Sequence, residues 1–126
     1  MVYVFLADGF EIIEALAPVD MLGRAKIDVK TVGVTGKTVR SSGGIEVVAD
    51  LTLEQIKKDK LDMIILPGGM PGTLNLEANE TVNDYIDYCY DKDIFIAAIC
   101  AAPSILAHKG MLNGKKATVF RPLPKI

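Results

Sequence analysis

The sequence predicts an α/β fold, a βαβ sandwich in which helices cover a mainly parallel sheet. Apolar runs without polar alternation, at residues 2–7, 61–66 and 94–99, are typical of strands that are buried on both faces. Segments with apolar residues at helical spacing lie between these runs, and strands that alternate with helices favour right-handed βαβ units. A chain of 126 residues without repeats or linkers is predicted to form one domain.

The first half of the chain is predicted to contain strands at 2–7 and 28–34, a helix at 11–25, and a hairpin of two short strands at 38–40 and 45–49. The first strand ends at Asp8-Gly9, which is a turn signal. The helix carries a stripe of apolar residues from Ile12 to Leu22, and Pro18 lies inside it. Because proline lacks an N–H and clashes with the preceding turn, we expect a kink or a break at Pro18.

The second half is predicted to contain a short helix from Asp50 or Thr52 to about Lys58, a strand at 61–66, a helix capped by Asn79, a strand at 94–99, a helix after Cys100 and a last strand at 117–120. The inner face of the helix after Asn79 is predicted to carry Val82, Ile86 and either Cys89 or Tyr90. These elements continue the alternation of strands and helices to the end of the chain.

Charge and composition argue against several classes of function. The net charge is −2 and the chain has no Trp, so neither nucleic acid nor an anionic membrane is an expected partner. No Cys and His residues have metal-ligand spacing, and Gly68-Gly69 lacks the lysine of a phosphate loop, so we expect neither a metal nor a cofactor. Two cysteines, with no basic leader and no apolar run long enough to span a membrane, indicate a reducing, cytoplasmic location.

The pattern changes from strand to helix at Cys100, which predicts a sharp turn there. Ala98 and Ala102, two residues on either side, are small, and Pro103 suits the first turn of a helix. This is the steric pattern of a nucleophile elbow. At a helix N-terminus the pKa of the thiol should fall, and the N–H of Ala101 should form half of an oxyanion hole. The alternative is an inert cysteine buried in a strand.

Three loops should meet beyond the carboxyl ends of the parallel strands, where ligands of such sheets bind: residues 8–14, residues 67–73 and Cys100. Gly68 and Gly69 permit a close backbone approach, so their N–H groups are candidates to complete the oxyanion hole. The alternative for this pair is a simple turn that needs a positive φ.

Glu14 and His108 are the candidate proton carriers. Glu14 is flanked by apolar residues on the first helix, and partial burial would raise its pKa and keep it protonated. The alternative is a carboxylate on an exposed helix face. His108 is the only His, and two helical turns carry it roughly 12 Å from Cys100, too far for direct proton transfer. Cys89 is predicted to lie in the core.

Three motifs, in this order, are similar to those of the ThiJ/PfpI superfamily: Ala-Asp-Gly-Phe-Glu-Ile-Ile-Glu at 7–14, Leu-Pro-Gly-Gly at 66–69 and Ala-Ala-Ile-Cys-Ala-Ala-Pro at 97–103. Over nearly the whole chain, the sequence most resembles the branch of the parkinsonism-associated deglycase and its bacterial relatives. The resemblance implies a flavodoxin-like three-layer sandwich, of the class I glutamine amidotransferase kind, and a homodimer.

The same resemblance assigns roles to individual residues. It implies that Cys100 is the nucleophile and an easily oxidised thiol, and that Glu14 is protonated and hydrogen-bonds this Cys. It also implies that the backbone donors are Gly68, Gly69 and Ala101.

The chain departs from the family pattern in two ways. Arg121 stands where several branches have a His, which argues against the peptidase branch. Family domains also continue past this point with further strands and a final helix. We therefore expect residues 1–126 to form a single domain that is incomplete at its C-terminus, with apolar surface that a second copy or another chain covers.

The resemblance implies a Cys-dependent enzyme that acts on a small reactive carbonyl of the methylglyoxal class, in a glyoxalase III-like or deglycase-like reaction. One alternative is a non-enzymatic redox sensor or chaperone-like protein that uses an oxidisable Cys100. A cysteine peptidase of the PfpI branch and an inactive truncated domain are further alternatives.

Overall fold

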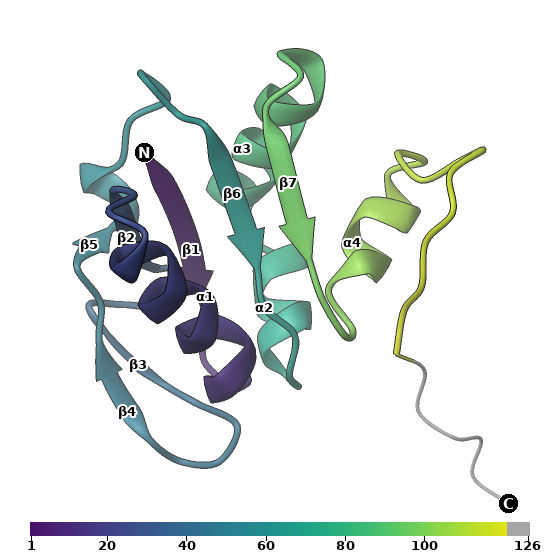
Figure 1. The fold of residues 1–126 in the computed structure, drawn as a ribbon. Coiled ribbons are helices and arrows are strands. Elements are labelled where there is room, and N and C mark those ends of the chain that lie inside the picture. The colour runs from purple at the N-terminus through teal and green to yellow at the C-terminus, as the bar shows by residue number, and fades with distance from the viewer. Residues whose placement is uncertain (121–126) are drawn as a thin grey trace, which may run out of the picture.

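The structure, a computed structural model, describes residues 1–120 and contains a five-stranded parallel sheet (Figure 1). The strands lie in the order β5-β2-β1-β6-β7, and every pairing within this sheet is parallel. Their bounds are β1 Val2–Leu6, β2 Val29–Gly33, β5 Leu51–Thr52, β6 Met63–Leu66 and β7 Phe95–Ala98. The order β2-β1-β6-β7 is that of a flavodoxin-like sheet, which confirms the predicted α/β fold.

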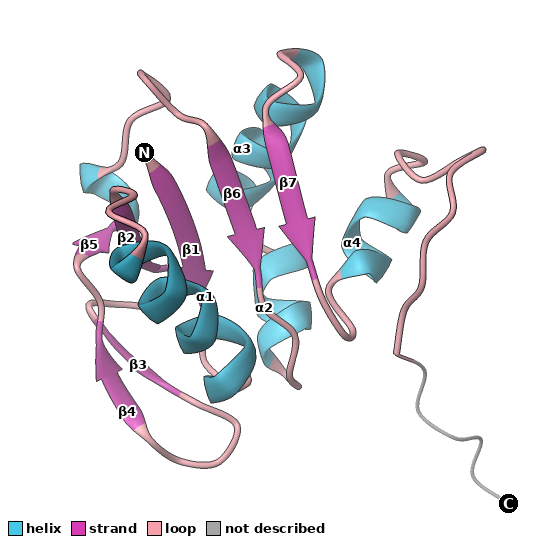
Figure 2. Ribbon diagram, in the orientation of Figure 1, coloured by secondary structure: helices cyan, strands magenta, loops and turns pink. Residues whose placement is uncertain are grey.

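Helices lie on both sides of this sheet, as Figure 2 shows. They are α1 Ile12–Arg24, α2 Gly72–Glu77, α3 Glu80–Asp91 and α4 Pro103–His108, with a short 3-10 helix, η1, at Leu53–Gln55. A separate antiparallel hairpin joins β3 Thr38–Arg40 to β4 Glu46–Val48, as predicted. Among residues 1–120, no helix is long and apolar enough to cross a membrane.

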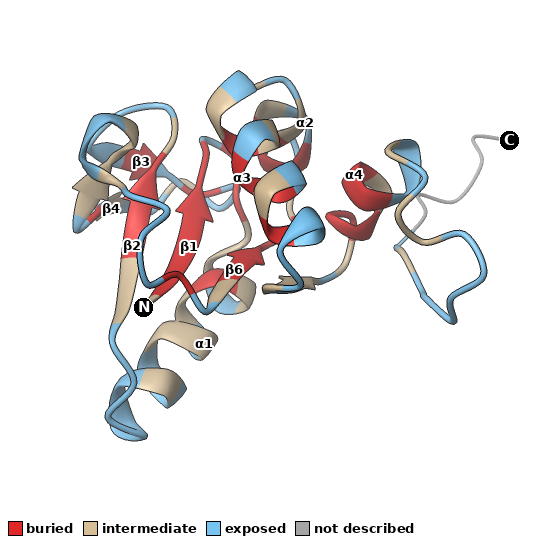
Figure 3. Cartoon of the chain, turned by 90° about the horizontal axis from the view of Figure 1, so that it is seen from above, coloured by how far each residue is buried: buried red, intermediate tan, exposed pale blue. Residues whose placement is uncertain are grey.

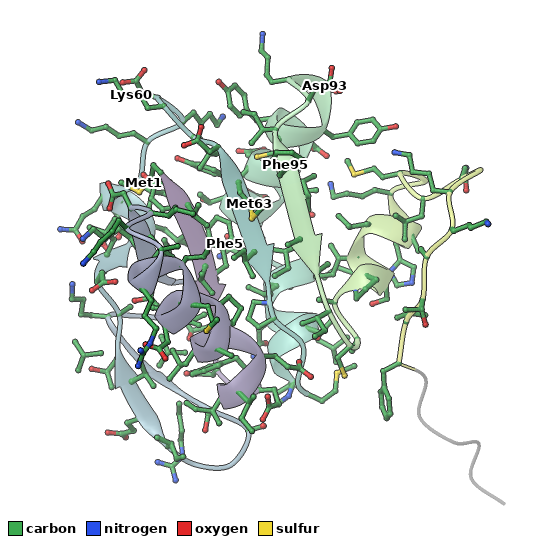
Figure 4. The ribbon with its side chains drawn as sticks, viewed as in Figure 1. Met1, Phe5, Lys60, Met63, Asp93 and Phe95 are labelled. Atoms are coloured by element: carbon green, nitrogen blue, oxygen red, sulfur yellow. The ribbon has the colours of Figure 1, made fainter. Side chains whose placement is uncertain are left out.

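The core lies on both faces of β1, all of whose residues are buried (Figure 3). Tyr3 and Phe5 join the cluster beneath α3, and Phe5 is labelled in the middle of the sheet in Figure 4. Val2, Val4 and Leu6 alternate with them and join the cluster beneath α1. A strand that is apolar on both faces is the expected sequence of a central parallel strand.

The first helix runs unbroken through Pro18, so the break that was one of the two expected outcomes does not occur. Proline removes only one helical hydrogen bond, the one that the carbonyl of Glu14 would accept. The residues around Pro18 pack against the sheet, with Leu16, Val19 and Leu22 against the α1-side cluster. This packing on both sides of the proline holds the helix together.

The segment from 50 to 58 contains β5 and the three-residue helix η1 instead of the predicted helix to about Lys58. Thr52, one of the two predicted caps, is the N-cap of η1. The side chain of Asp50 does not cap a helix, because it accepts hydrogen bonds from the backbone N–H and the hydroxyl of Thr31 on β2, at 2.9 and 3.1 Å. The side chain of Gln55 accepts from the N–H of Thr52 at 2.9 Å, which closes the short η1 turn.

Two further differences lie near the ends of β6 and α4. The short helix α2 was not predicted, since six residues are too few to show a helical period. Residues 117–120 do not form the predicted last strand. Instead the N–H of Phe120 donates to the carbonyl of Cys100 at 2.7 Å, so this segment runs past the turn at Cys100.

Candidate functional site around Cys100

The loops that follow β1, β6 and β7 meet at one end of the sheet, below the arrowheads in Figure 1. The N–H of Glu11 donates to the carbonyl of Gly68 at 2.9 Å. A Cβ on Gly69 would lie 2.7 Å from the carbonyl oxygen of Gly9, and one on Gly68 would lie 2.8 Å from the Cβ of Cys100. The predicted convergence of the three loops is therefore present, and both glycines are needed for it.

Cys100 lies in the sharp turn between β7 and α4. Its φ is +61°, in the left-handed region that few residues other than glycine occupy. Ala102 is fully buried, and α4 begins at Pro103 as predicted. A strained backbone at a cysteine that remains half-exposed is the arrangement expected of a strand-to-helix elbow.

Glu14 does not lie on an exposed helix face. Its half-buried carboxylate oxygen Oε1 accepts a hydrogen bond from the N–H of Gly68 at 3.0 Å. A Cβ on Gly68 would lie 2.7 Å from this oxygen and would also collide with the Cβ of Cys100. Gly68 thus lies between the acid and the thiol, and its N–H, one of the predicted donors of the oxyanion hole, is already bonded to Glu14.

Two other N–H groups point to an anion-binding role. Gly69 and Ala101 lie outside the helices and strands. Within residues 1–120, neither of their N–H groups donates to a backbone carbonyl. The N–H of Ala101 interacts with the sulfur of Cys100 and lowers the pKa of that thiol. Gly69 has a φ of +94°, which suits glycine alone in such a close approach.

Other groups outweigh Ala101, so the pKa of Cys100 is raised and not lowered as predicted. Burial is the largest cause, followed by the negative charge of an ionised Glu14, the hydrogen bond to it, and the charge of Glu11. The predicted decrease in this pKa assumed that the dipole of the helix after Cys100 has the largest effect. Because α4 has only six residues and begins three residues after Cys100, its dipole is weak at the sulfur.

The other candidate residues lie away from the thiol. His108 is at the far end of α4, where its Nδ1 is 2.6 Å from Oε2 of Glu77. Cys89 is fully buried, as predicted, and burial raises the pKa of its thiol to about 11. Within the described part of the chain, no group of three or more His, Cys, Asp or Glu side chains is arranged to hold a metal ion. Arg121 lies outside the described residues.

An apolar groove of about 350 Å³ begins beside Glu14 and was not predicted. It runs between α1 and the sheet, and only the combined placement of three elements creates it. Three elements line the groove. They contribute Glu14, Pro18, Met21 and Leu22 from α1, Met63, Ile65 and Leu66 from β6, and Ala97, Ala98 and the following Ile99 from β7.

Comparison with known proteins identifies a family and curated relatives. A family model described as the DJ-1/PfpI family matches residues 1–124. Protein dj-1beta of Drosophila melanogaster is 36% identical over 118 residues, which are 93% of this chain and 63% of that protein. Deglycase TK1284 of Thermococcus kodakarensis is 27% identical over 117 residues, 93% of this chain and 70% of that protein. The chain therefore spans less than two thirds of the length of the Drosophila relative.

Solved structures of related proteins have the same fold. The structure of oxidized Toxoplasma gondii DJ-1 matches with a TM-score of 0.88 at 34% identity, covering 94% of this chain and 65% of that one. The crystal structure of Drosophila melanogaster DJ-1beta matches with a TM-score of 0.82 at 36% identity, covering 86% of this chain and 59% of that one. The expected flavodoxin-like fold is therefore confirmed.

Proposed function

The chain belongs to the DJ-1/PfpI family, and from that premise we propose that it is a Cys-dependent enzyme acting on small reactive carbonyls such as methylglyoxal. One observation carries the proposal: the Cys100 thiol and the Glu14 carboxyl meet across Gly68, beside the N–H groups of Gly69 and Ala101. This combination supplies a nucleophile, a proton carrier and an oxyanion hole at one point. A relative named as a deglycase supports the same substrate class.

In the first step, the Cys100 thiolate adds to the aldehyde carbon, which forms a C–S bond and turns the carbonyl oxygen into an alkoxide. The N–H groups of Gly69 and Ala101 donate to this oxygen, and a proton completes the hemithioacetal. Moving the hydrogen of the former aldehyde carbon, as a proton, to the ketone carbon through an enediol gives a lactoyl thioester. The aldehyde carbon is thereby oxidised and the ketone carbon reduced. Water then hydrolyses the thioester to lactate and frees the thiol.

Glu14 is the proposed proton carrier of these steps. When the acid takes the proton that it shares with Cys100, its charge no longer opposes the thiolate, and it donates a hydrogen bond to the sulfur. It can then return the proton to the alkoxide. In the deglycase-like alternative, the substrate is an early adduct of the carbonyl with an amine, and the amine is the leaving group.

The test is lactate production from methylglyoxal by the purified protein. Cys100→Ser should reduce the rate to the uncatalysed background, and Glu14→Gln should reduce it by about a hundredfold, the usual contribution of general acid–base catalysis. Cys89→Ala is the matched control, because it removes the buried thiol and leaves the site intact; its rate should equal that of the wild type. Lactate production that survives Cys100→Ser would refute the proposal.

A wild-type protein without turnover would instead favour the redox-sensor alternative, provided that peroxide oxidises Cys100 selectively. The peptidase alternative finds no support, because the only His of the chain is bonded to Glu77 at the far end of α4. A Cys-His pair would need His108 within hydrogen-bond reach of the thiol.

A further inference from the structure

The two proposed oxyanion donors lie at the starts of two short helices. The first turn of α2 holds Gly69: the N–H and the hydroxyl of Thr73 both donate to the carbonyl of Gly69, at 2.9 and 3.0 Å. The first turn of α4 holds Ala101 in the same way, because the N–H and the hydroxyl of Ser104 donate to its carbonyl at 3.1 and 2.7 Å. The carbonyl group of each donor residue is therefore fixed to the first turn of a helix.

The opposite ends of the same two helices are joined to each other. Glu77 is the last residue of α2 and His108 the last residue of α4, and Oε2 of Glu77 lies 2.6 Å from Nδ1 of His108. Between the two ends, Leu76 and Ile105 are buried in one apolar cluster. The two helices thus share one apolar cluster and are joined by this hydrogen bond at the end away from the site.

We propose that the His108–Glu77 pair is a positioning contact that sets the distance between the N–H groups of Gly69 and Ala101. The inference rests on the proposed function, because it concerns an oxyanion hole. A helix of six residues is rigid and about 9 Å long, so a displacement of one end is transmitted to the other end. His108 is a positioning residue and does not touch the substrate, which agrees with its place at the far end of α4.

The experiment compares two reactions of the same thiol. Addition to an aldehyde places negative charge on the carbonyl oxygen of the reacting carbon and therefore needs the oxyanion hole. Alkylation by iodoacetamide places no such charge and needs only the thiolate. His108→Ala and Glu77→Ala should each lower kcat for methylglyoxal by about three- to tenfold, with a smaller change in KM, since displaced catalytic groups are costly even when none is lost. Their alkylation rates should stay within about twofold of wild type. The double variant should be no slower than either single variant, as expected for partners in one contact.

Lys109→Ala is the matched control. Lys109 follows His108 and joins the same helix to α3, with its Nζ 2.9 Å from Oδ1 of Asp87. Its loss should leave kcat within about twofold of wild type, because α3 carries no donor of the site. His108 is 66% exposed, so its truncation should not unfold the protein, and the melting temperature of each variant checks this.

Three results would overturn the inference: an unchanged kcat in His108→Ala, an equal loss of turnover and alkylation, or an equal loss in Lys109→Ala. If the wild type turns over no carbonyl, the proposed function fails separately. The inference is then tested by how well methylglyoxal protects Cys100 from iodoacetamide through reversible hemithioacetal formation. His108→Ala should weaken this protection by the same three- to tenfold or so, and unchanged or absent protection would refute it.

Discussion

At the scale of single residues, Gly68 determines how close the acid and the thiol of the site lie. Its missing side chain leaves room for the carboxylate of Glu14 on one side and for Cys100 on the other, and its N–H orients that carboxylate. Any Cβ at this position would push the two functional groups apart. A glycine with an ordinary φ is therefore required here by packing and not by backbone conformation.

Two other residues make stability depend on pH above neutrality. Burial raises the pKa of the Cys89 thiol to about 11 and that of the Tyr85 phenol to about 12. An unfolded thiol loses its proton near its ordinary pKa of about 8.5, so between about 8.5 and 11 the unfolded chain binds fewer protons than the folded one. The free energy of unfolding should therefore fall as pH rises through this window.

Urea unfolding at several pH values between 8 and 11 or so measures this slope. Cys89→Ala is the control, because it removes the buried thiol and should reduce the slope below the titration range of Tyr85. The slope that remains there belongs to Cys100, whose pKa is also raised. A wild-type free energy of unfolding that stays constant across the window would contradict the prediction.

At the scale of elements, α3 is the helix whose sequence specifies it most completely. Asn79 caps it, since its side chain accepts from the N–H of Val82 at 3.0 Å. The predicted stripe of Val82, Ile86 and Cys89 is buried. By contrast α2 and α4 have six residues each, no side-chain cap, and starts that follow the turns of the site. Such short helices are stabilised by packing.

Asn79→Ala should lower the free energy of unfolding by about 1 kcal/mol, the usual cost of losing an N-cap. Urea unfolding measures the change. Asn79→Asp keeps an acceptor at the cap and should leave stability nearly unchanged. Equal losses in both variants would contradict the role of the Asn79 side chain as the N-cap acceptor of α3.

At the scale of the whole molecule, the sheet is covered unevenly. On the α1 side, the groove exposes parts of β6 and β7, and Met21 at its rim is 65% exposed. Phe95, labelled on β7 in Figure 4, is 72% exposed. Apolar surface next to a parallel sheet is normally buried, so it favours association.

We propose that the chain forms a homodimer through this apolar surface, and native mass spectrometry measures this. The mass of one chain is 13.6 kDa, and the native species should have twice this mass. Met21→Lys places a charge at the rim of the groove and should weaken the association. A wild-type protein that stays monomeric at micromolar concentration without aggregating would contradict the expectation.

The candidate site was predictable from sequence to the extent that local pattern encodes it. The change of period at Cys100, the small residues around it and Pro103 predicted a turn that the structure contains. The meeting of the three loops followed from parallel-strand geometry. The predicted direction of the pKa shift at Cys100 was wrong, because a helix start is visible in a sequence whereas the burial of the thiol and its distance to Glu14 are not.

The sequence by itself determined the alternation of the longer strands and helices, the parallel sheet and the apolar core, because each of these follows from periodicity along the chain. It did not predict β5 and α2, which are too short to show a period, and its last strand at 117–120 does not form. Tertiary structure alone decided that α1 continues through Pro18, that Asp50 binds Thr31 instead of capping a helix, and that His108 pairs with Glu77. These contacts join residues far apart in the chain, or depend on packing around a local defect. Their free energy therefore arises only once the elements have assembled.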